Sequence, residues 1–154
     1  MTNCTLHTLI ADVCLIHDGK VLLVKYTDTN KYDHQSGWFL PDDALHHLEH
    51  PQDAARRILK EQLGLSVHDL KLNHIESFKG NDGSWHLAFH YRVVLTAKPG
   101  LEPSSDISEA EWFSVPDGTA VPDGAAVDAL PPKNEFAHHG WGHTVIKAVL
   151  KEIS

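Results

Sequence analysis

A length of 154 residues with 42% hydrophobic content is enough for one domain with a single core, and we expect residues 1–154 to form it. The formal net charge is −8 with histidine neutral, and the basic residues are scattered apart from Arg56 and Arg57, which argues against a groove for nucleic acid polymers. Since neither a membrane-spanning apolar run nor a secretion leader is evident, we expect a cytoplasmic protein.

The N-terminal segment predicts a β-hairpin. Residues 5–16 and 21–26 are apolar and rich in strand-forming residues, and residues 17–20 between them have the composition of a turn. Cys4 and Cys14 both lie at this first predicted strand, so they cannot reach each other within it. We therefore expect two reduced thiols rather than a disulfide.

A helix is predicted after a polar stretch of chain. Residues 27–36 have no period and predict a loop, whereas residues 37–40 form a short apolar segment. A polar link over residues 42–50 leads to Pro51, which is favoured in the first turn of a helix. Apolar residues then recur at helical spacing up to Gly64, which predicts an amphipathic helix over residues 52–63 with a glycine cap.

The second half of the sequence predicts another hairpin. Residues 70–79 and 84–97 have strand composition, and the Gly-Asn-Asp-Gly segment between them suits a tight turn. Residues 109–115 predict a last short strand.

The C-terminal part begins with residues 116–132, which are rich in Pro, Gly and Ala and predict the least regular structure. A terminal helix is predicted over about residues 141–153. Strands on both sides of a helix, followed by further strands and a helix, predict an α+β protein or an α/β/α sandwich.

The stretch from Trp38 to Leu65 resembles the Nudix box, whose pattern is G-x5-E-x7-R-E-U-x-E-E-x-G-U, with U a bulky aliphatic residue. The matching residues are Glu49, Arg57, Leu59, Glu61 and the closing Gly64-Leu65. The departures are Asp43 for the first Gly, Ile58 for the Glu after the Arg, and Gln62 for the last Glu. The later run Glu111-Trp112-Phe113 also looks like a signature of the family, so the resemblance extends over most of the chain.

This resemblance implies the Nudix-type α/β/α sandwich with a mixed β-sheet. It also implies a hydrolase that uses Mg²⁺ or Mn²⁺ to cleave a pyrophosphate linkage in a nucleoside diphosphate derivative, which is a small-molecule substrate. The altered box implies that this activity is weakened. By analogy with relatives, a homodimer is conceivable.

In the family, the box helix carries three carboxylates at spacing i, i+3 and i+4, where they share one face and hold the cation. The corresponding residues here are Ile58, Glu61 and Gln62, so one carboxylate of three is kept. The resemblance makes Glu61 the catalytic residue and a metal ligand, and Gln62 can still offer an amide oxygen. Glu49 and Arg57 match the family's structural ion pair, which ties the loop to the helix.

Other acids would supplement this reduced set. Asp106 stands six residues before Trp112, where the family often uses a further acid, and Glu109 is the second choice. Asp42 and Asp43 stand where the family has two glycines. Because aspartate tolerates a left-handed backbone, we expect the turn to survive there, with Asp42 as a further metal ligand.

Two other functions fit the same residues. A non-catalytic module that binds a nucleotide or a protein would also lose charged ligands while keeping the structural pair. The 13 histidines, among them the loop group His46, His47 and His50 and the pair His139 and His143, allow a transition-metal protein, although scattered histidines more often reflect solvation. No residue carries a signature for reading a base, so the sequence does not predict the substrate.

Overall fold

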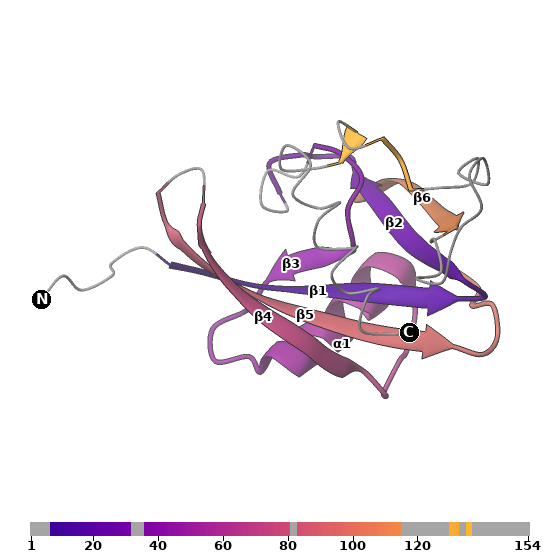
Figure 1. The fold of residues 1–154 in the computed structure, drawn as a ribbon, viewed down its shortest axis with the longest axis horizontal. Helices are drawn as coiled ribbons and strands as arrows, with labels where there is room; N and C mark the ends of the chain where they lie inside the picture. The colour runs from indigo at the N-terminus through magenta and orange to yellow at the C-terminus, as the bar shows by residue number, and fades with distance from the viewer. Residues whose placement is uncertain (1–6, 32–35, 81–82, 115–129, 133–134, 137–154) are drawn as a thin grey trace, which may run out of the picture.

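The computed structural model describes residues 7–31, 36–80, 83–114, 130–132 and 135–136. They form a mixed β-sheet with one helix packed on it (Figure 1), which confirms the predicted fold class. The elements are β1 (His7–His17), β2 (Lys20–Tyr26), β3 (Asp42–Ala44), α1 (Pro51–Leu63), β4 (Lys71–Lys79), β5 (Trp85–Leu95) and β6 (Ile107–Ser114). No helix in these residues is long and apolar enough to cross a membrane.

Strand β1 is the centre of the sheet, whose order is β4-β5-β1-β2-β6. It pairs in parallel with β5 along its whole length, from His7 opposite Trp85 to His17 opposite Leu95. On its other edge, β1 pairs antiparallel with β3 and then with β2. The pairing of β1 with β5 joins the two predicted hairpins into one sheet, as the parallel arrows of Figure 1 show.

Helix α1 covers one face of this sheet. Side chains of a strand alternate between faces, and Val13 and Leu15 of β1 share a buried cluster with Leu59 and Leu63 of α1. The even-numbered residues of β1 therefore project from the opposite face, where Cys14 packs with Trp38. Burial and the nearby Asp12 carboxylate raise the pKa of the Cys14 thiol, so this free cysteine is unreactive.

Both ends of α1 follow from local sequence. The His50 imidazole accepts a hydrogen bond from the Gln52 amide at 3.1 Å and caps the first turn, where Pro51 needs no partner for an amide hydrogen. Gly64 ends the helix in the left-handed conformation at φ 69°. A Cβ atom at Gly64 would lie 2.9 Å from the Cβ of Glu102, so both the backbone and the packing require glycine.

The link over residues 42–50 differs from its prediction. Asp42 and Asp43 belong to the short strand β3, and neither has the left-handed backbone expected of them. Pairing with β1 imposes this extended conformation, because Asp42 lies opposite Asp12 and Asp43 opposite Ala11. The left-handed residue of this link is Leu48, at φ 63°. The predicted terminal helix and most of the irregular segment 116–132 lie outside the described residues.

Candidate functional site

Arg57 organises the loop before the helix. Its guanidinium contacts Glu49 at 2.9 Å, Asp43 at 2.8 Å and Glu61 at 3.4 Å, and it donates to the carbonyl of Ala44 at 3.0 Å. Burial would lower the pKa of Arg57, but the hydrogen bonds with Glu49 and Asp43 raise it. The hydrogen bond from Arg57 is the main cause that lowers the pKa of Glu49. Arg57 thus fixes residues 43–49 against α1.

Gln62 is buried and uses both ends of its side-chain amide. Its Nε2 donates to the backbone carbonyl of Asp42 at 2.9 Å, and its Oε1 accepts from the Tyr26 hydroxyl at 2.8 Å. The Tyr26 oxygen also accepts from the Asp42 amide at 2.9 Å. These three residues form a closed hydrogen-bonded group that joins α1, β2 and β3, so the Gln62 amide oxygen already has a partner.

Ile58 takes the place of the box glutamate that follows the arginine. Its side chain is fully buried in a small apolar cluster with Ala11 and Ala54, against which Leu45 packs. The residue therefore stabilises the contact between α1 and β1. Its surroundings hold apolar side chains, and a carboxylate would be costly there.

Glu61 projects into solvent. Its side chain is 60% exposed and lies 3.4 Å from Arg57. Asp106 lies on a loop that contacts the end of α1, since the amide of Ser104 donates to the carbonyl of Gln62 at 2.9 Å. The Asp106 carboxylate is in turn 2.9 Å from the ammonium group of Lys31.

The carboxylate of Asp42 does not share a face with α1. Directly paired residues of an antiparallel ladder project to the same side, and Asp42 lies opposite Asp12. Asp12 is an even-numbered residue of β1, and the odd-numbered Ala11 and Val13 face α1. The structure therefore brings the backbone carbonyl of Asp42 to Gln62, whereas its buried side chain projects from the other face.

That other face carries a group of polar side chains that the sequence reasoning did not find. Asp12 and His90 are directly paired across β1 and β5, and His74 pairs with His90 across β5 and β4. The Asp12 carboxylate lies 2.7 Å from Nδ1 of His90. A single oxygen of Glu76 lies 3.2 Å from Nε2 of His90 and 3.1 Å from Nε2 of His74. The available signal was weak, namely the alternate residues His74 and Glu76 on one strand.

The charges of this group hold one another in place. Burial raises the pKa of Asp12, against the attraction of His90. Burial would also lower the pKa of His90. The charge of Asp12, together with the hydrogen bonds that His90 forms with Asp12 and Glu76, instead raises the pKa of His90 to about 10. The hydrogen bond from His90 is the main cause that lowers the pKa of Glu76. At neutral pH the His90 side chain is therefore a positively charged imidazolium that lies between two carboxyl groups.

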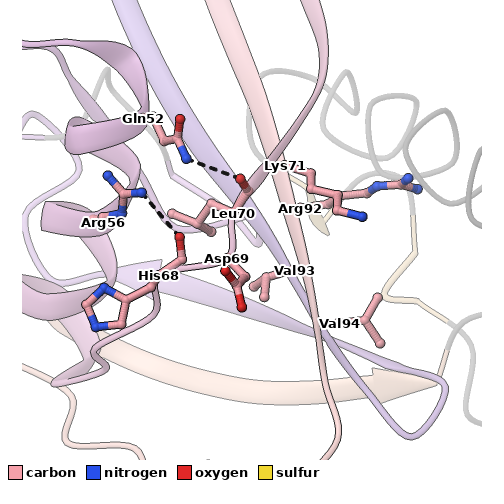
Figure 2. A pocket seen from close by; sticks show the side chains of 9 residues that line it. All are labelled: Gln52, Arg56, His68, Asp69, Leu70, Lys71, Arg92, Val93 and Val94. Carbon is pink, nitrogen blue, oxygen red and sulfur yellow. Dashed lines mark hydrogen bonds between the residues drawn. The ribbon is translucent and has the colours of Figure 1, made fainter.

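A groove of about 750 Å³ lies where α1 passes the start of β4 and the end of β5. Figure 2 shows Gln52 and Arg56 reaching from the helix to the backbone carbonyls of Leu70 and His68, at 3.4 Å and 3.2 Å. The residues that line it are Gln52, Arg56, His68, Asp69, Leu70, Lys71, Arg92, Val93 and Val94. Glu61 is not among them, nor are Asp12, His74, Glu76 and His90.

The family model of the NUDIX domain matches residues 7–131. The chain belongs to the Nudix family. This confirms the predicted resemblance, and no curated protein sequence matches the chain.

Several solved structures share the fold of this chain. The MutT NUDIX hydrolase from Burkholderia pseudomallei has a TM-score of 0.65 and 18% identity, over 96% of this chain and 98% of that one. A second structure is a bifunctional NMN adenylyltransferase/ADP ribose pyrophosphatase from Francisella tularensis, complexed with AMP and a Mn ion. It has a TM-score of 0.66 and 14% identity, over 96% of this chain and 42% of that one.

The MutT/nudix family protein from Enterococcus faecalis has a TM-score of 0.61 and 21% identity, over 73% of this chain and 46% of that one. The chain thus spans less than half the length of the proteins from Francisella and Enterococcus. At these identities the likeness establishes the fold.

Proposed function

We propose that this Nudix protein is a divalent-cation-dependent hydrolase that cleaves a pyrophosphate linkage in a nucleoside diphosphate derivative, at a reduced rate. The observation that carries the proposal is the contact set of Arg57. It keeps the loop 43–49 on the box helix and leaves the Glu61 carboxylate 60% exposed beside it. The hydrolase neighbours support the reaction class, and one of them was solved with AMP and a Mn ion.

The donor set fits a Mg²⁺ or Mn²⁺ ion that arrives with the substrate better than one held before the substrate binds. Mg²⁺ in proteins keeps several waters and uses one or two carboxylates together with substrate phosphates. Glu61 would supply one carboxylate, and Asp106 would supply a second after separating from Lys31. Gln62 Oε1 and the backbone carbonyl of Asp42 would contribute after their present hydrogen bonds open.

A bound cation would withdraw charge from the phosphates and lower the pKa of a water that it holds. The chain itself contributes positioning. Arg57 lies 3.4 Å from the Glu61 carboxylate and favours its position beside the loop, and the Gln62–Tyr26 hydrogen bond joins the end of α1 to β2. We assign Glu61 as the catalytic residue on this basis.

A non-catalytic module is the second candidate, and one observation favours it. The Gln62 amide donates a hydrogen bond directly to the Asp42 carbonyl at 2.9 Å, so the two groups are bonded to each other and a cation could bind between them only after this bond opens. Buried Ile58 offers no ligand atom. In this reading the protein binds a nucleotide or a protein partner and releases no product.

A turnover assay separates the two candidates. Purified protein is incubated with nucleoside triphosphates, ADP-ribose and dinucleoside polyphosphates in Mg²⁺ or Mn²⁺, and products are quantified. We expect slow turnover that Glu61→Gln abolishes. The matched control is Asp53→Asn, which removes a 64% exposed carboxylate that also pairs with an arginine of α1 and should keep the rate.

Absence of product for every compound would reject the hydrolase, and thermal stabilisation by the same compounds would then support the binding module. Persistence of turnover in Glu61→Gln would reject the assignment of Glu61. The cytoplasmic location, the homodimer and the extent of the single domain stay predictions from the sequence.

A further inference from the structure

We propose that His74, Glu76 and His90 form a binding site for one divalent transition-metal ion, with Zn²⁺ as the best match. The site is independent of the proposed hydrolase function, because its residues come from β4 and β5 and project from the sheet face opposite α1. The three residues offer two imidazole nitrogens and one carboxylate oxygen.

The distances suit a shared ion. Zn²⁺ binds histidine nitrogen and carboxylate oxygen at about 2.0–2.2 Å, so ligand atoms around a tetrahedral ion lie about 3.4 Å apart. The Glu76 oxygen is 3.1 Å from His74 Nε2 and 3.2 Å from His90 Nε2, and all three ligand atoms lie within 4.8 Å of one another. Small side-chain shifts would therefore complete the coordination.

The strand geometry makes this grouping rigid. His74 and Glu76 are alternate residues of one strand and so share a face, and His90 is the registered neighbour of His74 on β5. The two imidazole rings lie 4.6 Å apart between their centroids. Ladder hydrogen bonds hold all three backbones, so little ordering is needed when an ion binds.

Both histidines have the outer contacts that metal-binding histidines use. Such residues donate the second ring nitrogen to a carboxylate or a carbonyl, which fixes the ring and the free nitrogen. The buried Asp12 carboxylate lies 2.7 Å from Nδ1 of His90 and leaves Nε2 directed at Glu76. Asp12 would thus be a positioning residue for the metal.

Asn73 provides the corresponding contact for His74. Its side-chain nitrogen lies 2.9 Å from His74 Nδ1, while its Oδ1 is buried without a hydrogen-bond partner among the described residues. A half-turn of the amide exchanges two atoms of similar size. The turned amide would accept the Nδ1 proton of His74 and free Nε2 for a metal.

The ligand types decide the class of ion. Imidazole nitrogen suits zinc and neighbouring transition metals, whereas Mg²⁺ and Ca²⁺ prefer oxygen. Two histidines and one carboxylate leave a fourth position open for water, as in catalytic zinc sites. The side chains of His74 and Glu76 are each 28% exposed, which gives an ion a path to the buried His90.

A proton is the competing occupant of this site. Without a metal, the contact between His90 and Glu76 is an ion pair that holds a proton. A zinc ion would replace that proton, so the same residues serve as a charged network in the free protein and as ligands in the bound one.

Metal titration of the untagged, chelator-treated full chain tests the proposal. We expect one equivalent of Co²⁺ to bind with the visible absorption of a four- or five-coordinate ion, and Zn²⁺ to displace it while equimolar Mg²⁺ does not. His74→Gln and Glu76→Gln should each lower the affinity at least about 100-fold, since loss of an outer contact alone costs about 10–100-fold.

Loop histidines provide the matched control. The double variant His46→Gln/His47→Gln removes two imidazoles that are no part of the group, and it should bind Co²⁺ as the wild type does. Unchanged binding in His74→Gln, loss of binding in the loop variant, or absence of binding in the wild type would each overturn the proposal. Should the strand variants fail to fold, ¹⁵N NMR of wild-type imidazoles decides: Zn²⁺ must shift the Nε2 signals of both His74 and His90, and unshifted signals reject the site.

Discussion

The side-chain amide of Gln62 donates to the backbone carbonyl of Asp42 at 2.9 Å. A glutamate at the same position would present two acceptors to one another, which is unfavourable unless a cation lies between them. The amide nitrogen of Gln62, in place of a carboxylate oxygen, thus forms a hydrogen bond that stabilises the fold.

Gln62→Glu should therefore be destabilised in chelator by about 1–3 kcal/mol, because the buried carboxylate loses its donor to the Asp42 carbonyl. Mn²⁺ should restore part of the loss by binding between the two oxygens. Thermal unfolding with and without Mn²⁺ measures both effects, with the wild type as the control that shows no comparable shift. Equal Mn²⁺ shifts in the two proteins would contradict this account.

Ile58→Glu should unfold the protein or destabilise it by several kcal/mol, because an unpaired carboxylate would enter the apolar cluster between α1 and β1. Ile58→Val keeps an apolar side chain and should cost about 0.5–1.5 kcal/mol. Urea unfolding of both variants checks the comparison. A folded Ile58→Glu protein of wild-type stability would show that this contact opens readily.

Leu48→Gly should stabilise the protein by about 0.5–1 kcal/mol. Leu48 has φ 63° and is 90% exposed, so its side chain strains the backbone and buries almost nothing. Glycine removes a cost of about 1–2 kcal/mol for the left-handed backbone, and the greater freedom of the unfolded chain offsets part of that gain. Leu48→Ala keeps the strain and should bring no comparable gain in the midpoint of thermal unfolding.

The ion pair of Glu49 with Arg57 should make stability depend on pH in the acid range. Arg57 lowers the folded-state pKa of Glu49 below its unfolded value of about 4.3. The stabilisation is therefore complete above the unfolded pKa and is lost as pH falls through the folded one.

Urea unfolding of the wild type and Glu49→Gln between pH 7 and pH 3 measures this dependence. We expect a difference of about 1–3 kcal/mol at pH 7 that narrows below about pH 4.3. Glu109→Gln removes the exposed pair with Lys25 and should change stability by less than about 1 kcal/mol at any pH. A Glu49→Gln difference that stays constant to pH 3 would refute the ion-pair explanation.

The sequence by itself determined the local elements and the family. Helix α1 follows from Pro51, the apolar period and Gly64, and the spacing of Glu49, Arg57 and Glu61 places them on one helix and its preceding loop. These features depend on residues within a few turns of one another, so a linear pattern records them.

Tertiary structure alone decided which side chains of the box already have hydrogen-bond partners. Gln62 forms hydrogen bonds with Tyr26 and Asp42, which are 36 and 20 residues away in the sequence. These bonds use both ends of the side-chain amide, which the sequence alone left available for a metal. Strand β3 likewise exists because β1 pairs with it, although two aspartates are poor strand formers.

The parallel register of β1 and β5 decided the rest. It brings Asp12 to His90 across 78 residues, and the neighbouring ladder adds His74 and Glu76. Sequence periodicity gives the face on which a strand residue lies but not its partner on another strand, because register depends on how the whole sheet packs.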